Sequence, residues 1–322
     1  MNELLTSYSL VAAISAIVVY AFSFIAFTLD LAKRAAPLEQ PAAVNTGTAQ
    51  AATAGGTLTT AVRPASLRDQ PPRTSRFGRV GMALATIGFA VNLIAVVLRG
   101  LAAGGRVPWS NMYEFALTGI LIIVGVFLAV NLWQKVAYLG TYVTGFALLA
   151  LVLATVNFYV GPVPLPPALQ SVWIVVHVLV AILGTAFFAL GAGLSALQLL
   201  QARREAGKAA GYRFLRTLPG ASALESLAYR LNVVGFVFWS FTLIFGAIWA
   251  ERAWGRYWGW DTKEVWTFII WVIFAGYIHA RATRGWRGSR AAWLAIIGFS
   301  AVLFNFTIVN LFFKGLHVYS GL

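Results

Sequence analysis

Eight long apolar segments limit what this chain can fold into. They cover residues 8–29, 80–98, 114–132, 136–157, 172–200, 232–250, 265–281 and 291–312. A bilayer core of about 30 Å needs about 20 largely apolar residues in one helix, which matches these lengths. Because backbone groups in lipid find no water, each spanning segment must satisfy its own hydrogen bonds as a helix. We therefore predict an all-α fold, a polytopic membrane bundle of about eight transmembrane helices.

The composition agrees with this prediction and excludes several other classes of protein. Hydrophobic residues make up 60% of the chain and charged residues only 11%, too few for the surface of a soluble domain. The mean hydropathy of +0.78 excludes a disordered chain. The absence of cysteine excludes a disulfide framework and any dithiol chemistry by the chain itself. The net charge of +14 indicates membrane orientation, so we expect no nucleic-acid partner.

Basic residues are distributed unevenly between alternate loops. Most of the 24 Lys and Arg residues lie in the loops after the first, third, fifth and seventh spans. The positive-inside rule places these loops in the cytoplasm and both termini outside. Asn2 and Glu3 precede the first span and Lys33 and Arg34 follow it, which reverses the charge order of a cleavable signal peptide. We expect this span to stay attached.

Three regions follow from this pattern: an N-terminal transmembrane helix over 1–30, a flexible cytoplasmic linker over 31–79 and a membrane core over 80–322. The linker is rich in Ala, Thr, Pro, Gln and Gly, a composition that cannot build a core of its own. Between the fifth and sixth spans, Ser222 and Glu225 have the spacing of a capping box, which predicts a short helix on the inner membrane surface.

The external loop 249–266 concentrates aromatic surface. Half of the twelve tryptophans lie between Trp249 and Trp271, whereas interfacial anchoring alone would scatter them over many helices. Gly255 and Gly259 separate the indoles and would let a planar ligand approach closely. We therefore predict a platform for a large flat molecule with an anionic edge. The candidate residues are Trp254, Trp258, Trp260 and Trp266, with Arg252, Arg256 and Lys263 for ligand carboxylates.

Asp261 and Glu264 are predicted to support this loop. Asp261 comes just before the seventh span and Glu264 follows three positions later, which is the spacing of a helix N-cap and its reciprocal partner. We expect the Asp261 carboxylate to cap that helix rather than to contact a ligand.

The chain has only three histidines, and two of them share the external face with the tryptophans. His177 lies near the outer start of the fifth span, and His317 lies just beyond the eighth. His279 follows Glu264 by 15 residues, which places it about 22 Å deeper, towards the cytoplasm. Two imidazoles on opposite faces of a porphyrin make a six-coordinate haem iron, and His177 and His317 could supply that pair. Zinc fits less well, because the chain has no cysteine and no histidine pair at short helical spacing.

Four motifs carry a resemblance to a known family. The stretch WGRYWGWDTKEVW at 254–266 resembles the tryptophan-rich WWD signature of the CcsA/ResC proteins, which handle haem in System II cytochrome c biogenesis. The segments PWSNMYEF at 108–115, YIHAR at 277–281 and GLHVY at 315–319 are similar to further segments of that family. The likeness covers approximately residues 80–322. Thr262 stands where the family commonly has proline, which would only preset the first helical turn.

The resemblance implies a set of roles and partners. It maps the external haem-binding pair onto His177 and His317, with haem b carried as substrate. It makes His279 one ligand of a deeper haem site, whose opposite ligand comes from a CcsB/ResB-type membrane subunit. The vinyl groups would then meet the thiols of an apocytochrome c Cys-x-x-Cys-His motif at the outer face of an energy-coupling membrane, such as the bacterial plasma membrane. Because this chain has no cysteine, separate thiol-reducing proteins are implied.

The chain would thus act within a cytochrome c synthase complex rather than alone.

The sequence also leaves other functions open. A System I haem-handling protein shares a similar tryptophan-rich loop. An exporter of haem or another anionic solute, without attachment activity, would need helices interrupted near the bilayer midplane. A purely structural anchor of a redox complex would bind no chromophore.

Overall fold

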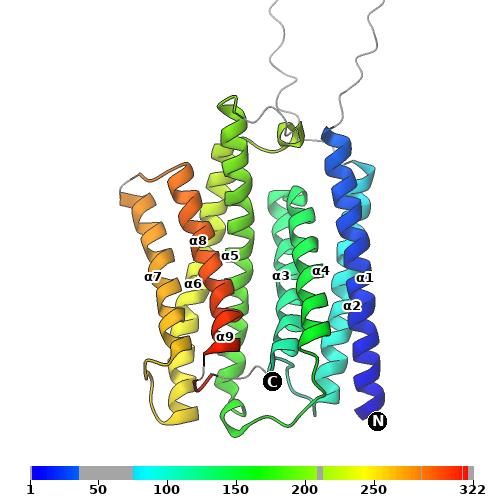
Figure 1. Cartoon of the computed structure of the whole chain (residues 1–322), viewed down its shortest axis with the longest axis vertical. Coiled ribbons are helices and arrows are strands. Elements are labelled where there is room, and N and C mark those ends of the chain that lie inside the picture. Colours follow the sequence, from blue (N-terminus) through cyan, green and yellow to red (C-terminus); the bar gives the residue numbers. More distant parts are fainter. Residues whose placement is uncertain (1, 36–74, 209–212, 284, 314, 318–322) are drawn as a thin grey trace, which may run out of the picture.

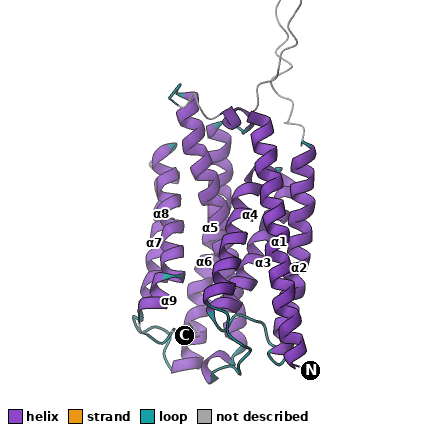
Figure 2. Cartoon of the chain, turned by 45° about the vertical axis from the view of Figure 1, so that its right-hand side comes forward, coloured by secondary structure: helices purple, strands orange, loops and turns teal. Residues whose placement is uncertain are grey.

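The computed structural model describes residues 2–35, 75–208, 213–283, 285–313 and 315–317, and all regular structure in these ranges is helical (Figures 1 and 2). The long helices are α1 (Asn2–Ala35), α2 (Arg76–Ala102), α3 (Met112–Gln134), α4 (Gly140–Asn157), α5 (Val172–Glu205), α6 (Ala221–Trp254), α7 (Thr262–Thr283) and α8 (Ser289–Phe306). A short α9 (Ile308–Phe312) and the 3₁₀ turns η2 (Ala137–Leu139), η3 (Pro167–Leu169) and η4 (Arg213–Thr217) complete the set. Within the described ranges, eight helical segments are long and apolar enough to cross a membrane, counting α8 with α9, and the prediction of a polytopic all-α bundle is confirmed.

Local sequence signals fix where several of these helices begin and end. The Asn111 side chain accepts a hydrogen bond from the Glu114 N–H at the start of α3, and the Ser171 hydroxyl accepts one from the Trp173 N–H at the start of α5. Each cap satisfies an amide that has no partner within its helix. The helix α6 ends at Trp254 and is capped by Gly255, whose φ of +70° lies in the left-handed region that glycine adopts without strain.

The helix α5 joins two groups of helices. On one side α3 packs against it, with α4, α1 and α2 beyond, and on the other side α6 and α8 pack against it, with α7 beyond (Figure 1). Each group has its own apolar core, the first around Val124, Phe127 and Leu190 and the second around Phe188 and Phe274. A membrane helix can approach its neighbour closely where small residues line the contact, as at Gly191 and Gly235 in the α5–α6 pair.

Four loop segments meet at one end of the bundle, which we call the tryptophan end. They are residues 103–111, 158–171, 255–261 and 315–317, and α1 also begins there (Figure 1). The opposite end, which we call the linker end, holds the last turn of α1, the first turn of α2, η4 and residues 285–288.

The structure corrects the expectation of a surface helix at 222–231. These residues form the first turns of α6, because Leu224, Ala228 and Leu231 are buried in the first core instead of facing a membrane surface. Glu225 does not cap the helix, since its carboxylate pairs with Arg281 at 2.9 Å.

Both edges of the linker predicted over 31–79 are helical in the structure. Residues 31–35 continue α1 and residues 76–79 open α2, while 36–74 lie outside the described residues. The last predicted span, 291–312, corresponds to α8 and α9 together, and the helix is interrupted at Thr307.

Candidate functional site

A cavity of about 270 Å³ opens at the tryptophan end, between the two groups of helices. Its walls are mainly apolar and come from α3, α4, α5, α6, α7 and α8 together with the loop segments at this end. Residues central to its chemistry are His177, Trp239, Trp249, Trp258, Lys263, Phe306 and His317.

His177 reaches the cavity from the second turn of α5. Its Nδ1 lies 3.0 Å from the carbonyl oxygen of Thr242 on α6. Because a carbonyl can only accept, Nδ1 must carry the proton, and Nε2 keeps its lone pair. Gly246 makes room for this ring, since a Cβ at that position would lie 2.8 Å from the His177 Cε1 atom.

His317 is held in the same way by a different acceptor. Its Nδ1 lies 2.7 Å from Oδ2 of Asp261, and the Leu316 N–H donates to Oδ1 of the same carboxylate at 3.1 Å. The hydrogen bond from His317 lowers the pKa of the Asp261 carboxyl below its ordinary value. The ionised carboxylate accepts a hydrogen bond from Nδ1–H of His317, so Nε2 of this neutral tautomer is again the free nitrogen.

Asp261 and Glu264 fold the tryptophan loop back onto α7. One oxygen of Glu264 accepts hydrogen bonds from the N–H groups of Gly259 at 2.8 Å and Asp261 at 3.0 Å, and Oδ2 of Asp261 accepts one from the Lys263 N–H at 3.4 Å. These are the reciprocal bonds of a capping box. Asp261 therefore has a second role that the sequence reasoning missed, because it caps α7 and also orients His317.

Trp249 is the residue that links the two histidines. Its indole is only 1% exposed and donates from Nε1 to the Ala168 carbonyl at 2.9 Å. The ring centroid lies 5.8 Å from that of His177 in a stacked arrangement, and 5.4 Å from that of His317 at an interplanar angle of 64°. Both imidazoles thus pack against one buried indole. The sequence analysis named Trp249 only as the start of the loop. Its contacts with both histidines depend on its burial, which residue spacing does not indicate.

Lys263 brings a cation into the cavity wall. Its ammonium group donates to the Asn305 carbonyl at 3.2 Å and to the side-chain oxygen of Asn310. These acceptors lie on either side of the interruption at Thr307, where the helical hydrogen-bond pattern changes. The Asn310 amide in turn lies 3.3 Å from Sδ of Met112 on α3, so the cation is tied to both sides of the cavity.

The other predicted tryptophans divide between the cavity and its surroundings. Trp258 lines the cavity, and Trp254 packs edge-on against His317 with ring centroids 4.8 Å apart. Trp260 is 73% exposed, and Trp266 packs against Phe304, away from the cavity lining.

The two loop arginines also lie outside the cavity lining. The Arg252 side chain is 66% exposed beside Glu251. Arg256 pairs with Glu264 at 3.4 Å, and its guanidinium lies against Gly259. The missing Cβ at Gly259 therefore admits Arg256, whereas the sequence suggested room for a ligand.

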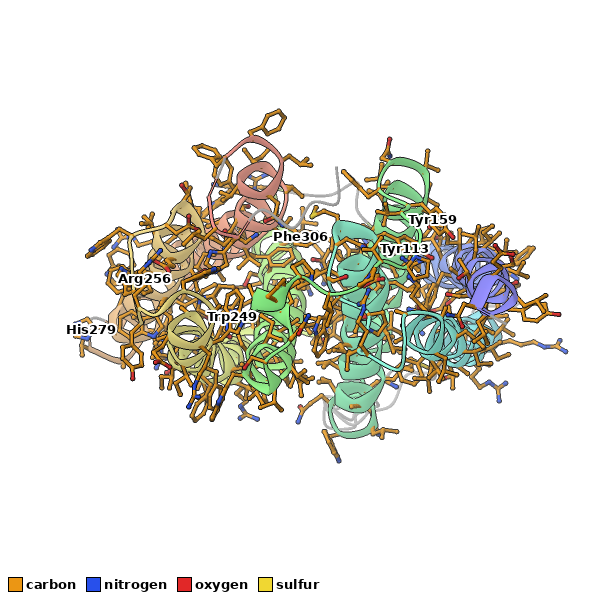
Figure 3. The ribbon with its side chains drawn as sticks, turned by 90° about the horizontal axis from the view of Figure 1, so that it is seen from below. Tyr113, Tyr159, Trp249, Arg256, His279 and Phe306 are labelled. Carbon is orange, nitrogen blue, oxygen red and sulfur yellow. The ribbon has the colours of Figure 1, made fainter. Side chains whose placement is uncertain are left out.

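His279 lies apart from the other two histidines. It is exposed on α7 near the linker end, and Figure 3 shows it at the outer edge of the bundle while Trp249 lies well inside. The structure therefore brings His177 and His317 to one cavity and keeps His279 on a separate surface.

The fold and the cavity define a multi-pass membrane protein with a histidine-lined cavity at one end of its helical bundle. Residues 109–317 match the model of the family described as cytochrome C assembly protein. Relatives called cytochrome c biogenesis protein CcsA include that of Guillardia theta, 33% identical over 73% of this chain and 86% of the relative, and that of Synechococcus elongatus, 34% identical over 75% and 86%. The CcsA of Chlamydomonas reinhardtii is 41% identical over 48% of this chain and 43% of its own length.

The chain belongs to the cytochrome c assembly protein family, because the family match covers most of its length. This membership assigns it a role in cytochrome c maturation. The matched range begins at Trp109 and ends at His317, so it contains both cavity histidines and the whole tryptophan loop.

Proposed function

We propose that the cavity at the tryptophan end binds haem b as a substrate, with His177 and His317 as the two axial ligands. One observation carries the proposal: both imidazoles line the same cavity, and each has its Nδ1 proton bound by an acceptor. Nε2 of each ring is then the nitrogen with a lone pair for iron. Two neutral imidazoles with fixed tautomers are a favourable donor set for haem.

The walls of the cavity suit the rest of the porphyrin. The flat apolar ring would find aromatic and aliphatic surface from residues such as Trp239, Trp258 and Phe306. The Lys263 ammonium is the cationic group of the described lining that could meet a propionate. Arg252 and Arg256 lie outside the lining, so we assign them no direct contact with the ring.

The proposed contribution to attachment is positioning. Thioether formation adds the S–H of a thiol across a vinyl C=C bond, so that a C–S bond forms and the hydrogen goes to the other vinyl carbon, without net oxidation. Holding the haem edge beside the Cys-x-x-Cys-His segment of an apocytochrome c would remove much of the entropy cost of that encounter. The acceptor thiols must be reduced, and a chain without cysteine leaves this to separate thiol-reducing proteins.

We further propose that His279 belongs to a second haem site shared with a CcsB/ResB-type membrane subunit. An ionisable side chain exposed on a membrane helix indicates a functional contact. Phe268, Val272 and Gly276 are exposed at helical intervals along the same helix and extend that face. Haem would then pass from His279 towards the tryptophan end, which the positive-inside rule assigns to the outer face of the membrane.

Absorption spectra of the purified full-length chain, loaded with haem b, test the outer site. The wild-type protein should show the split α and β bands of reduced bis-imidazole haem. His177→Ala and His317→Ala should each lose this spectrum and cytochrome c maturation, and added imidazole should restore both. His279→Ala is the matched control and should keep the spectrum of the outer site. Wild-type spectra and full maturation in both cavity variants would refute the proposed ligands.

A further inference from the structure

Glu114 lies at the start of α3 in the segment PWSNMYEF, and the proposed haem ligation does not use it. Its side chain is completely buried. One carboxylate oxygen accepts hydrogen bonds from Arg99 Nε at 2.9 Å and Arg106 Nη2 at 3.1 Å. The other accepts from Arg106 Nη1 at 2.7 Å and from the Ser110 backbone N–H and hydroxyl at 3.1 and 2.9 Å. A carboxylate with this many charge-assisted bonds is held in one orientation.

The two arginines reach beyond Glu114 to the loop between α4 and α5. Arg99 donates from Nη2 to the Val160 carbonyl at 2.6 Å, and Arg106 donates from Nη2 to the Val163 carbonyl at 3.3 Å. The Arg99 guanidinium also lies 5.2 Å from the ring centre of Tyr113, which contacts Tyr159 edge-on (Figure 3). We call Arg99, Arg106 and Glu114 the Glu114 clamp.

The loop that the clamp holds is a wall of the haem cavity. Leu165 and Leu169 line the cavity, and the Ala168 carbonyl accepts the Nε1 hydrogen bond of Trp249. Trp249 then contacts both His177 and His317. Consecutive contacts therefore run from the clamp through residues 158–171 to the two histidines.

We propose that the Glu114 clamp is a positioning device for the cavity, because it sets the loop 158–171 that holds Trp249 against both histidines. This inference rests on the proposed haem function. Arg99 and Arg106 bring two cations to one carboxylate, so loss of the Glu114 charge would remove the ion pair of both arginines. Neutralising the buried Glu114 side chain should therefore increase the motion of the loop 158–171, although this loop lies between α4 and α5.

The test compares Glu114→Gln with Glu225→Gln in the full chain. Glu225 is also a buried carboxylate paired with an arginine, but it lies at the linker end beside Arg281. Because the chain has no cysteine, Gly161→Cys gives a single site for a nitroxide label, and a Cβ there would meet no atom within 4 Å. The nitroxide spectrum reports loop motion without haem, and titration with haem b reports the cavity.

We expect Glu114→Gln to increase the motion of the label and to weaken haem binding at least tenfold, as supporting residues of metal ligands do. Glu225→Gln should change neither quantity. Glu114→Asp keeps the charge and should fall between the wild type and Glu114→Gln. An unchanged label spectrum in Glu114→Gln, or increased motion with wild-type haem affinity, would overturn the proposal. Increased motion in a chain whose wild type binds no haem through its histidines would instead reject the proposed function and leave the clamp standing.

Discussion

The contact between Asp261 and His317 can be tested by a substitution that replaces one acceptor oxygen of the carboxylate with a donor. Asp261→Asn keeps the shape of the side chain, and asparagine is as good a helix N-cap as aspartate, so α7 should still begin at Thr262. The change removes an acceptor. The carboxylate receives Leu316 N–H on one oxygen and His317 Nδ1 on the other, whereas an amide offers a single oxygen.

The expected loss of haem affinity in Asp261→Asn depends on which group the amide nitrogen faces. If the NH₂ group turns towards His317, Nδ1 must become the acceptor, the proton moves to Nε2, and the ring cannot bind iron. If it turns towards Leu316, the Leu316 N–H faces a donor instead of an acceptor, and the segment 315–317 loses this contact. Removal of such supporting contacts lowers metal affinity by about 10- to 100-fold, or about 1.4 to 2.7 kcal/mol.

Two measurements on the purified chain follow this loss. Haem b titration gives the affinity, and a spectroelectrochemical titration gives the reduction potential. The carboxylate makes the imidazole a stronger donor and favours ferric iron, so the potential should rise in Asp261→Asn. The control is Glu251→Gln, an acidic residue close by with an exposed partner, and it should change neither value. Wild-type affinity and potential in Asp261→Asn would refute the role assigned to this contact.

Two further substitutions test the cavity. Gly119→Leu should weaken haem b binding at least tenfold, because a Cβ there meets only Phe115, at 3.9 Å, and the side chain would enter the cavity. In the same titration, run without a partner subunit, Gly276→Leu on the exposed face of α7 should bind haem b as the wild type does. Trp249→Phe keeps an aromatic ring at this position but removes the hydrogen bond to the Ala168 carbonyl, which should lower the free energy of unfolding by about 1–3 kcal/mol. We expect this variant to have a lower thermal unfolding midpoint and a lower affinity for haem b. An unchanged midpoint would contradict the expectation.

The architecture was largely predictable because span length is a direct consequence of membrane thickness. The eight spans and the all-α class follow from apolar length alone. The error at 222–231 arose because a capping-box spacing is local, whereas the burial of Leu224 and Leu231 depends on the neighbouring helices. The sequence alone does not show which helices pack against these two residues.

The site was predictable in its residue types and less so in its contacts. Scarcity of histidine pointed to His177 and His317, and both line one cavity. The contacts of Trp249 with both histidines could not be read from spacing, because they depend on a hydrogen bond to the Ala168 carbonyl, which is 81 residues away in the chain. The arginines of the tryptophan loop were assigned to a ligand from proximity in sequence, but tertiary packing turns Arg256 towards Glu264.

The two cavity histidines lie on structurally different segments. His177 belongs to the second turn of a 34-residue helix, whereas His317 lies outside the helices, in the segment 315–317, and is fastened through Asp261. A ligand on a loop yields to a competitor more readily than one on a long packed helix. The histidine of an incoming Cys-x-x-Cys-His segment would thus displace His317 and leave His177 in place. With the proposed ligation, release of a finished cytochrome would then depend on the His317 bond rather than on the His177 bond.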